Sequence, residues 1–394
     1  MQPKKSKNNN WVGMNVLRLG LASFLNDISS EIILPIMPMF ILSLGGSPVI
    51  IGLLAGSRNA IENLSNIFIG HWSDKIGYRK IFVSSGYFLS SGCKFLLSLA
   101  KWWPAAFVFA SVERVGKGFR KTPIDTIIAE SSRGKIGLGF GVHRAFDTCG
   151  AVIGSLASFV LLSYFHFSYH TIILVAAFIG FFALLPIRWV AEVSRIPVKI
   201  PLLKRIKAFS PELKNFFFIS GLFSLGYFSY MFFLMKIHSV FIGKPSIVMP
   251  VFLYFISNVF YAAGSIPIGM LGDKIGRSRM LICGYVLFSI ISISFIVSRT
   301  ISVFILLFVL YGLVRAIVGV NQRAYVTSIA NIEDRAVVLG ALHTMTGTIM
   351  LLSNFIAGVL WQYALPEATF MFGAIVSILA ALLLFLKKEF YFLS

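Results

Sequence analysis

Long apolar stretches alternate with short polar segments along almost the whole chain. A predominantly apolar stretch of about 18 residues or more is long enough to cross the hydrocarbon core of a bilayer as a helix. Six such stretches are predicted at residues 14–44, 48–70, 81–99, 102–123, 139–164 and 168–190, and six more at 216–243, 246–271, 280–298, 300–323, 336–362 and 368–387. This pattern predicts an all-α integral membrane protein with twelve transmembrane helices.

One long polar segment interrupts this series near its middle. Residues 191–215 carry prolines and a run of basic residues, namely Pro197, Pro201, Pro211, Lys199, Lys204, Arg205, Lys207 and Lys214. Proline and clustered charge disfavour a continuous membrane helix. We therefore expect a six-helix bundle over residues 1–190, a basic cytoplasmic linker over residues 191–215, and a second six-helix bundle over residues 216–394.

Composition and charge change the picture in one respect. Hydrophobic residues make up 57% of the chain and charged residues only 13%, which excludes an ordinary soluble domain with roughly 25% charged residues. The formal charge of +20 would suggest nucleic acid as a partner in a soluble protein. Here most Lys and Arg residues lie at the termini, in the linker and in alternate loops. The positive-inside rule then predicts a cell-membrane protein with both termini cytoplasmic, whose basic side chains face membrane lipids and not nucleic acid.

Two segments about 200 residues apart share a sequence pattern. Residues 70–80 read GHWSDKIGYRK and residues 269–279 read GMLGDKIGRSR, each between the second and third predicted span of its half. Arg114 and Arg315 occupy equivalent places in the fourth spans, and His143 and His343 lie near the start of the fifth. These matches in register predict an internal duplication. Two duplicated bundles around a central site are a common plan of transporters.

Each position of the repeated loop has a physical role. A glycine at the end of a span allows two helices to approach closely, and the later glycine permits a tight turn between helices. The aspartate can lie against a helix N-terminus or a neighbouring arginine.

Both copies resemble the signature loop of the major facilitator superfamily. Arg114 and Gly118 are similar to that superfamily's fourth-helix motif, with Lys117 where glutamine is usual. The resemblance implies a secondary transporter, not an enzyme, with no cofactor and no structural metal. It also implies a small-molecule or ion substrate, alternating access between two halves, and a monomer.

In that superfamily the loop aspartate belongs to a cytoplasmic gate. The residues assigned to the gate by the resemblance and by loop proximity are Gly70, Asp74, Lys75, Gly77, Arg79, Arg120, Glu130, Gly269, Asp273, Lys274, Gly276 and Arg277. We expect Asp74 to pair with Arg120 or Lys121, and Glu130 to pair with Arg79.

The fifth predicted span matches the superfamily's antiporter motif in part. Gly141, Gly150 and Gly154 have the right spacing, whereas Ser155 replaces the motif's proline. The partial match slightly favours export by antiport. Close packing of two helices explains the same glycines equally well.

Charged residues inside the spans are the candidates for coupling and substrate binding, because each costs about 2.5–3.5 kcal/mol at mid-bilayer. The candidates, all in the first half, are Asp27, Glu31, Glu62, Glu113, Arg114, Arg144 and Asp147. Asp27 is the expected proton site, close to Arg114 at a central cavity, with Glu31 and Arg114 tuning it or touching substrate. Two further pairs, Arg58 with Glu62 and Arg144 with Asp147, have helical spacing and are expected to be structural ion pairs.

The favoured function is therefore proton-coupled transport of a small organic solute. Uptake by symport, a cation or metal carrier built on the carboxylates of the first half, and a non-transporting receptor remain alternatives. Aromatic residues of the seventh span, including Tyr227, Phe228, Tyr230, Phe232 and Phe233, are candidates for an aromatic pocket. Pro35 and Pro38 are expected to bend the first span.

Overall fold

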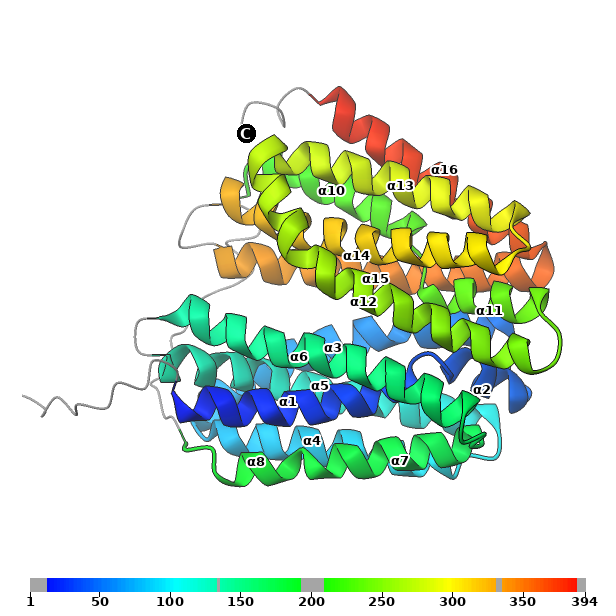
Figure 1. Ribbon diagram of the computed structural model, residues 1–394. Helices are drawn as coiled ribbons and strands as arrows, with labels where there is room; N and C mark the ends of the chain where they lie inside the picture. Colours follow the sequence, from blue (N-terminus) through cyan, green and yellow to red (C-terminus); the bar gives the residue numbers. More distant parts are fainter. Residues whose placement is uncertain (1–12, 133–134, 193–208, 331–334, 388–394) are drawn as a thin grey trace, which may run out of the picture.

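The computed structural model describes residues 13–132, 135–192, 209–330 and 335–387, and this part of the chain is helical throughout, with short turns between the helices (Figure 1). Helices from the first half of the chain lie together in the lower part of Figure 1, and those from the second half lie above them. The helices of both groups run roughly parallel or antiparallel to one another. This arrangement places two helical bundles side by side.

The first group begins on the side of the molecule from which the N-terminus leaves. It comprises α1 (Met14–Ile33), α2 (Met37–Ser43), α3 (Pro48–Ile76), α4 (Arg79–Ser98), α5 (Trp103–Ser131), α6 (Ile136–Ser163), α7 (Tyr169–Phe182) and α8 (Leu184–Arg188). Between α1 and α2 the axis bends by 45°. The bend lies at Pro35 and Pro38, as predicted, because proline cannot donate the backbone hydrogen bond that a straight helix needs.

The second group has a similar succession of long helices. It comprises α10 (Pro211–Gly226), α11 (Tyr230–Val240), α12 (Lys244–Ile275), α13 (Arg277–Val297), α14 (Ile301–Ile329), α15 (Arg335–Tyr363) and α16 (Pro366–Leu386). The break between α10 and α11 falls at Tyr227–Ser229, where the Ser229 side chain caps α11 by accepting from the Met231 N–H at 3.3 Å. This break matters because its residues face the space between the two groups.

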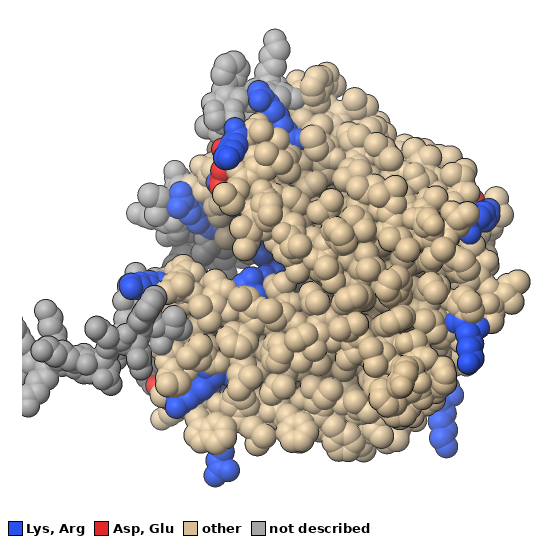
Figure 2. All heavy atoms as spheres, in the orientation of Figure 1, with Lys and Arg blue, Asp and Glu red and all other residues tan. Residues whose placement is uncertain are grey.

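The described helices fall within or extend the twelve predicted apolar ranges. Within the described residues, eight helical stretches are long and apolar enough to cross a membrane, or nine if α1 and α2 form one bent span. The remaining long helices α3, α4 and α5 carry buried charges or many serines, which lowers their hydropathy. Figure 2 shows the visible face as largely uncharged between margins that carry Lys and Arg. The molecule is thus a multi-pass membrane protein, and a total of twelve spans stays a prediction.

The two groups of helices contact each other most closely at the end where α2 and α11 lie. There α3 packs against α15 through glycine, so that a Cβ added at Gly56 would lie 2.7 Å from the Leu351 Cα. The Val49 N–H also donates to Gln362 Oε1 at 3.3 Å across the same contact. At the opposite end, where α1 begins, Figure 2 shows a hollow between the groups with basic side chains inside it. The molecule is closed at one end and open at the other.

Candidate functional site

A cavity of about 210 Å³ lies between the two groups of helices. Its wall combines Leu34, which follows α1, and residues of α3 and α5 with residues of α11, α14, α15 and the break before α11. The lining residues are Leu34, Ala55, Arg58, Asn59, Arg114, Tyr227, Phe228, Ser229, Tyr230, Met231, Tyr311, Arg315, Met350 and Asn354. Arg58, Arg114 and Arg315 each lie near the middle of a long helix. The cavity is therefore central in the molecule, and three of its wall residues carry positive charge.

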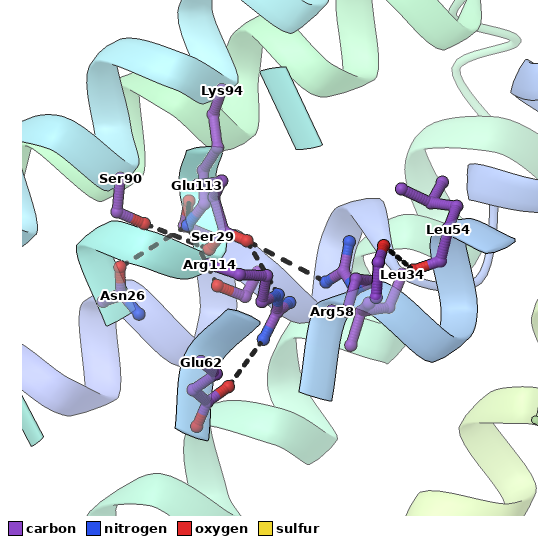
Figure 3. Close-up of polar contacts among 12 residues, drawn as sticks. Asn26, Ser29, Leu34, Leu54, Arg58, Glu62, Ser90, Lys94, Glu113 and Arg114 are labelled. Carbon is purple, nitrogen blue, oxygen red and sulfur yellow. Dashed lines mark hydrogen bonds and ion pairs between the residues drawn. The ribbon is translucent and has the colours of Figure 1, made fainter. Parts of the chain in front are cut away.

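The two arginines from the first half belong to a buried ionic cluster, drawn in Figure 3. Glu113 pairs with Arg114 Nε at 2.9 Å and with Arg58 Nη2 at 3.9 Å, and it accepts from Ser90 Oγ at 3.1 Å. Glu62 pairs with Arg114 Nη1 at 3.4 Å and with Lys121 Nζ at 3.5 Å. The expected pair of Arg58 with Glu62 along one helix is wrong, because tertiary packing offers each group a partner on α5.

The arginine from the second half has different surroundings. Arg315 Nη1 donates to Asn258 Oδ1 at 2.8 Å, and its guanidinium lies 4.7 Å from the centre of the Tyr261 ring. Among the described residues no carboxylate lies within ion-pair distance of Arg315. Of the three cavity arginines, Arg315 is thus the one whose charge is not directly neutralised by a protein carboxylate.

Glu31 reaches Arg315 through an amide. One carboxylate oxygen, Glu31 Oε2, accepts from Tyr254 Oη at 2.9 Å and from Asn258 Nδ2 at 3.1 Å. Because the other face of the same amide accepts from Arg315, Asn258 joins a negative and a positive group across the contact between α1 and α12. The sequence singled out Glu31 and Arg315 as charges within spans, but gave no sign that Asn258 connects them.

Asp27 and Arg114 do not meet as expected. Asp27 is half-buried and its Oδ1 accepts from Asn26 Nδ2 at 3.5 Å, while Arg114 is held by Glu62 and Glu113. Instead, Asp27 faces α6, where its Cβ would lie 3.2 Å from a Cβ added at Gly150. Both residues lie near mid-helix, but they project from α1 and α5 towards different neighbours.

The expected pair of Arg144 with Asp147 is also wrong. Asp147 Oδ2 pairs with His143 Nδ1 at 3.6 Å, one helical turn earlier. Arg144 Nη2 donates to Tyr261 Oη at 2.7 Å, on α12 of the other half. Arg144 therefore contributes to the contact between the halves, since the Tyr261 ring also lies under Arg315.

Lys94 is a buried cation of α4, and its position within the third predicted span did not reveal its partners. Its Nζ donates to Ser29 Oγ and Ser30 Oγ, both at 2.9 Å, and to Asn26 Oδ1 at 3.4 Å (Figure 3). With 2% of its surface exposed, this ammonium group is satisfied by neutral oxygens of α1. Polar side chains at Asn26, Ser29 and Ser30 on one helix face were the available signal.

The two repeated loops have the geometry that their glycines predict. Gly77 ends α3 with φ of +78° and Gly276 ends α12 with φ of +98°. Positive φ is readily adopted only by glycine, so each residue permits the tight turn into the next helix. The close approach expected at Gly269 lies one turn later, at Gly272, where an added Cβ would collide with the Asn321 side chain.

In the first loop, Arg79 pairs with Glu130 at 3.2 Å, which confirms the expected ion pair. The Arg79 backbone N–H also donates to Glu192 Oε1 at 2.8 Å, so a carboxylate caps the N-terminus of α4. Arg120 is buried and its guanidinium lies 4.3 Å above the Tyr87 ring. The surroundings of Gly70, Asp74 and Lys75 lie outside the described residues, so the expected contacts of Asp74 stay a prediction.

The second loop is held by its own ion pair. Asp273 Oδ1 pairs with Arg277 Nη2 at 2.9 Å across the turn, and Arg277 Nη1 donates to the Ala324 carbonyl at 2.6 Å. Lys274 is exposed. The loop between α12 and α13 is thereby tied to α14.

Of the three α6 glycines that match the antiporter motif, two lie at a tight helix contact. Added Cβ atoms would lie 2.7 Å from the Phe24 carbonyl at Gly150 and 2.6 Å from the Ile28 carbonyl at Gly154. At Gly141 an added Cβ would meet nothing within 4 Å. The expectation of close packing is therefore wrong for Gly141, because no other described helix lies against the position that a side chain there would take.

The aromatic candidates of the seventh span divide into two sets. Tyr227, Phe228 and Tyr230 line the cavity. Phe232 and Phe233 point into the hydrophobic core of the second half. The break between α10 and α11 causes this division, because it turns the residues around Ser229 towards the cavity.

Comparison with known proteins agrees with this architecture. The family model described as Major Facilitator Superfamily matches residues 19–257 and 216–391. An uncharacterised MFS-type transporter of Methanocaldococcus jannaschii is 44% identical over 385 residues, covering 97% of this chain and 96% of that protein.

Solved structures share the fold at low sequence identity. The nucleoside transporter NupG superposes with a TM-score of 0.75 at 18% identity, covering 94% of this chain and 98% of that one. A bacterial homologue of the human lysosomal transporter Spinster superposes with a TM-score of 0.71 at 15% identity, covering 98% of this chain and 97% of that one. Together with the paired loops and the central cavity, these matches show that the chain belongs to the major facilitator superfamily of membrane transporters.

Proposed function

We propose that this protein is a secondary active transporter that carries a small solute across the cell membrane by alternating access, coupled to protons. The observation that carries the proposal is the central cavity, which takes its wall from both halves of the chain. A site between two rocking bundles can face each side in turn. The basic side chains near the termini support a cytoplasmic position for the open end, by the positive-inside rule.

The contacts between the halves support rocking as the motion. At the closed end, α3 and α15 approach closely at Gly52, Gly56 and Gly358, where an added Cβ would lie within 3 Å of the backbone of the opposite helix. At the open end, the gate residues Arg79 and Asp273 are each held within their own half. These two ion pairs therefore need not break when one half moves against the other.

The carboxylates of α1 are the proposed proton sites. Glu31 accepts two hydrogen bonds from α12 of the opposite half, so protonating it removes a charge-assisted contact across the interface. Asp27 faces α6 without an ion-pair partner among the described residues. A proton at Glu31 thus changes the energy of the contact between the halves, which is what coupling requires.

The direction of coupling has two candidates. The glycine pattern of α6 favours export by antiport, as in the sequence interpretation. Glu31 favours the alternative, cotransport of proton and solute. Its carboxylate is linked to Arg315 through Asn258, and a negatively charged group of the substrate would compete with it for Arg315. The cation or metal carrier has less support, since arginines line the cavity and the described residues contain no group of three His, Cys, Asp or Glu suited to a metal.

Transport by purified protein in vesicles tests the proposal. Proteoliposomes enclosing a pH-sensitive dye are given radiolabelled small organic acids, amines and neutral solutes under imposed pH gradients. We expect accumulation of at least one solute to follow the gradient, and its sign distinguishes cotransport from antiport. In Glu31→Gln, downhill flux should persist while accumulation is lost.

Glu367→Gln is the matched control, because it removes a carboxylate that pairs with Lys236 near the start of α16, away from the cavity. This variant should accumulate solute like the unmodified protein. Accumulation that still follows the gradient in both Glu31→Gln and Asp27→Asn would remove the proposed proton sites.

A further inference from the structure

We infer that the substrate of the central cavity is a small organic anion with an aromatic or otherwise planar apolar body. The inference rests on the proposed transport function and deepens it by naming the chemical class that the cavity recognises. Three features carry it: the charge of the wall, the separation of charged from aromatic surfaces, and the volume.

The charged residues of the cavity wall are all positive. Arg58, Arg114 and Arg315 line the cavity, whereas none of the described residues that line it is Asp, Glu or His. Glu62 and Glu113 lie behind Arg58 and Arg114 and neutralise them. In the part of the chain that the structure describes, the partners of Arg315 are neutral, namely the amide of Asn258 and the ring of Tyr261. Arg315 is half-buried at the cavity wall and reaches the Glu31 carboxylate only through Asn258, so a ligand that brings a negative charge directly to Arg315 gains a charge-assisted hydrogen bond that the protein itself does not supply.

The aromatic side chains of the wall come from the second half. Tyr227, Phe228, Tyr230 and Tyr311 line the cavity on the same half as Arg315. Aromatic rings bury a large apolar area and stack favourably on planar groups. Because charge and aromatic surface adjoin, a ligand with an acidic group on an aromatic body satisfies both at once.

The volume sets the size of the ligand. An apolar cavity of about 150 Å³ is enough to bind benzene, and the cavity here is about 210 Å³. One ring with one acidic group fits this space. A larger substrate would require the open conformation to widen further.

The break between α10 and α11 reinforces the preference for an anion. Ser229, Tyr230 and Met231, at the start of α11, all line the cavity. The N-terminus of a helix carries partial positive charge from unpaired N–H groups. At α11 the Met231 N–H is capped by Ser229 Oγ and the Ser229 N–H donates to Asn354 Oδ1, so the helix dipole adds only a small part to the positive potential of Arg315.

The test measures binding and needs no transport. The full-length protein purified in detergent is titrated with benzoate and phenylphosphonate, and with benzyl alcohol and benzylamine as neutral and cationic analogues, while its thermal unfolding is followed. A ligand of the folded state raises apparent stability. We expect at least one of the two acids to bind with a Kd more than tenfold lower than that of either analogue. A tenfold difference in Kd corresponds to about 1.4 kcal/mol.

Arg315→Gln should lose at least tenfold in affinity for the acid, whereas Arg315→Lys should retain part of it. The matched control is Arg299→Gln, which removes an exposed arginine that bonds only backbone carbonyls at the end of α13 and should bind acid like the unmodified protein. If Arg315→Gln fails to fold, Tyr311→Ala serves as a second variant. It removes an aromatic residue of the wall and should lower the affinity for the acid and for benzyl alcohol by a similar factor.

The outcomes separate the two proposals. Absence of binding by both acids, or equal or tighter binding of benzyl alcohol or benzylamine, overturns the anion class. Proton-driven transport of a neutral or cationic solute in vesicles would also overturn it while leaving the proposed function intact. Arg315-dependent binding of an acid without any flux would leave the ligand class standing and refute proton-driven transport.

Discussion

Replacing Glu113 with glutamine is expected to destabilise the protein strongly. The side chain keeps its size but loses its charge, and Glu113 is 6% exposed in a cluster with Arg114 at 2.9 Å and Arg58 at 3.9 Å. Both arginine side chains are less than one-tenth exposed. Among the described residues, the change therefore leaves Arg58 without a carboxylate partner and Arg114 with Glu62 alone.

The magnitude follows from burial. Two unit charges about 4 Å apart interact by about 4 kcal/mol at an effective dielectric constant of 20, and breaking one partner out of a buried ion pair typically costs about 3–5 kcal/mol. We expect a loss in this range for Glu113→Gln. Asp273→Asn makes the same chemical change at a pair with an equal distance of 2.9 Å, but Asp273 is 64% exposed. Exposed pairs of this spacing contribute about 0.3–0.5 kcal/mol.

The assay is equilibrium unfolding in mixed micelles, with increasing dodecyl sulfate and helicity followed by circular dichroism. The two variants are compared with the unmodified protein under identical lipid and detergent conditions. If Glu113→Gln lowers the free energy of unfolding by no more than Asp273→Asn does, burial does not set the strength of this ionic cluster and the reasoning fails. A loss for Glu113→Gln that disappears in high salt would point to the same conclusion, because salt screens exposed charges and barely affects buried ones.

Three further changes test the packing and the bridge between the halves. Gly56→Val should collide with the α15 backbone and shift the protein away from this conformation. In this variant, a cysteine introduced at Met350 should react faster with an impermeant thiol reagent added at the closed side. Unchanged labelling would argue against the conformational shift. Gly154→Val should cost about 1–3 kcal/mol in the same unfolding assay by overpacking, with Gly141→Ala near neutral, and equal losses would refute this account. Asn258→Leu should leave downhill flux but lose its response to a pH gradient; a normal response would exclude the amide bridge from coupling.

Several features were predictable because they depend on local sequence. The apolar stretches fixed the positions of the long helices, because a backbone in lipid must satisfy its hydrogen bonds within the helix. Pro35 and Pro38 indicated the bend between α1 and α2. The glycines at Gly77 and Gly276 indicated tight turns, since few other residues adopt positive φ.

The partners of the buried charges were not predictable in the same way. Arg58 with Glu62 and Arg144 with Asp147 have helical spacing, yet Arg58 pairs with Glu113 and Arg144 bonds Tyr261. A long arginine side chain reaches a neighbouring helix as easily as the next turn of its own. Spacing along one helix therefore states which pairs are possible, and the packing of helices selects among them.

The sequence by itself determined that this chain is an all-helical membrane protein, where most of its helices lie, and which family it resembles. Hydropathy, proline and glycine act on the backbone within a few residues, so their effects can be predicted from the local sequence. The central cavity, the unneutralised charge of Arg315 and its link to Glu31 through Asn258 were decided only by the tertiary structure. These residues are far apart in the chain, and nothing in the local sequence sets which helix faces meet when the two halves pack together.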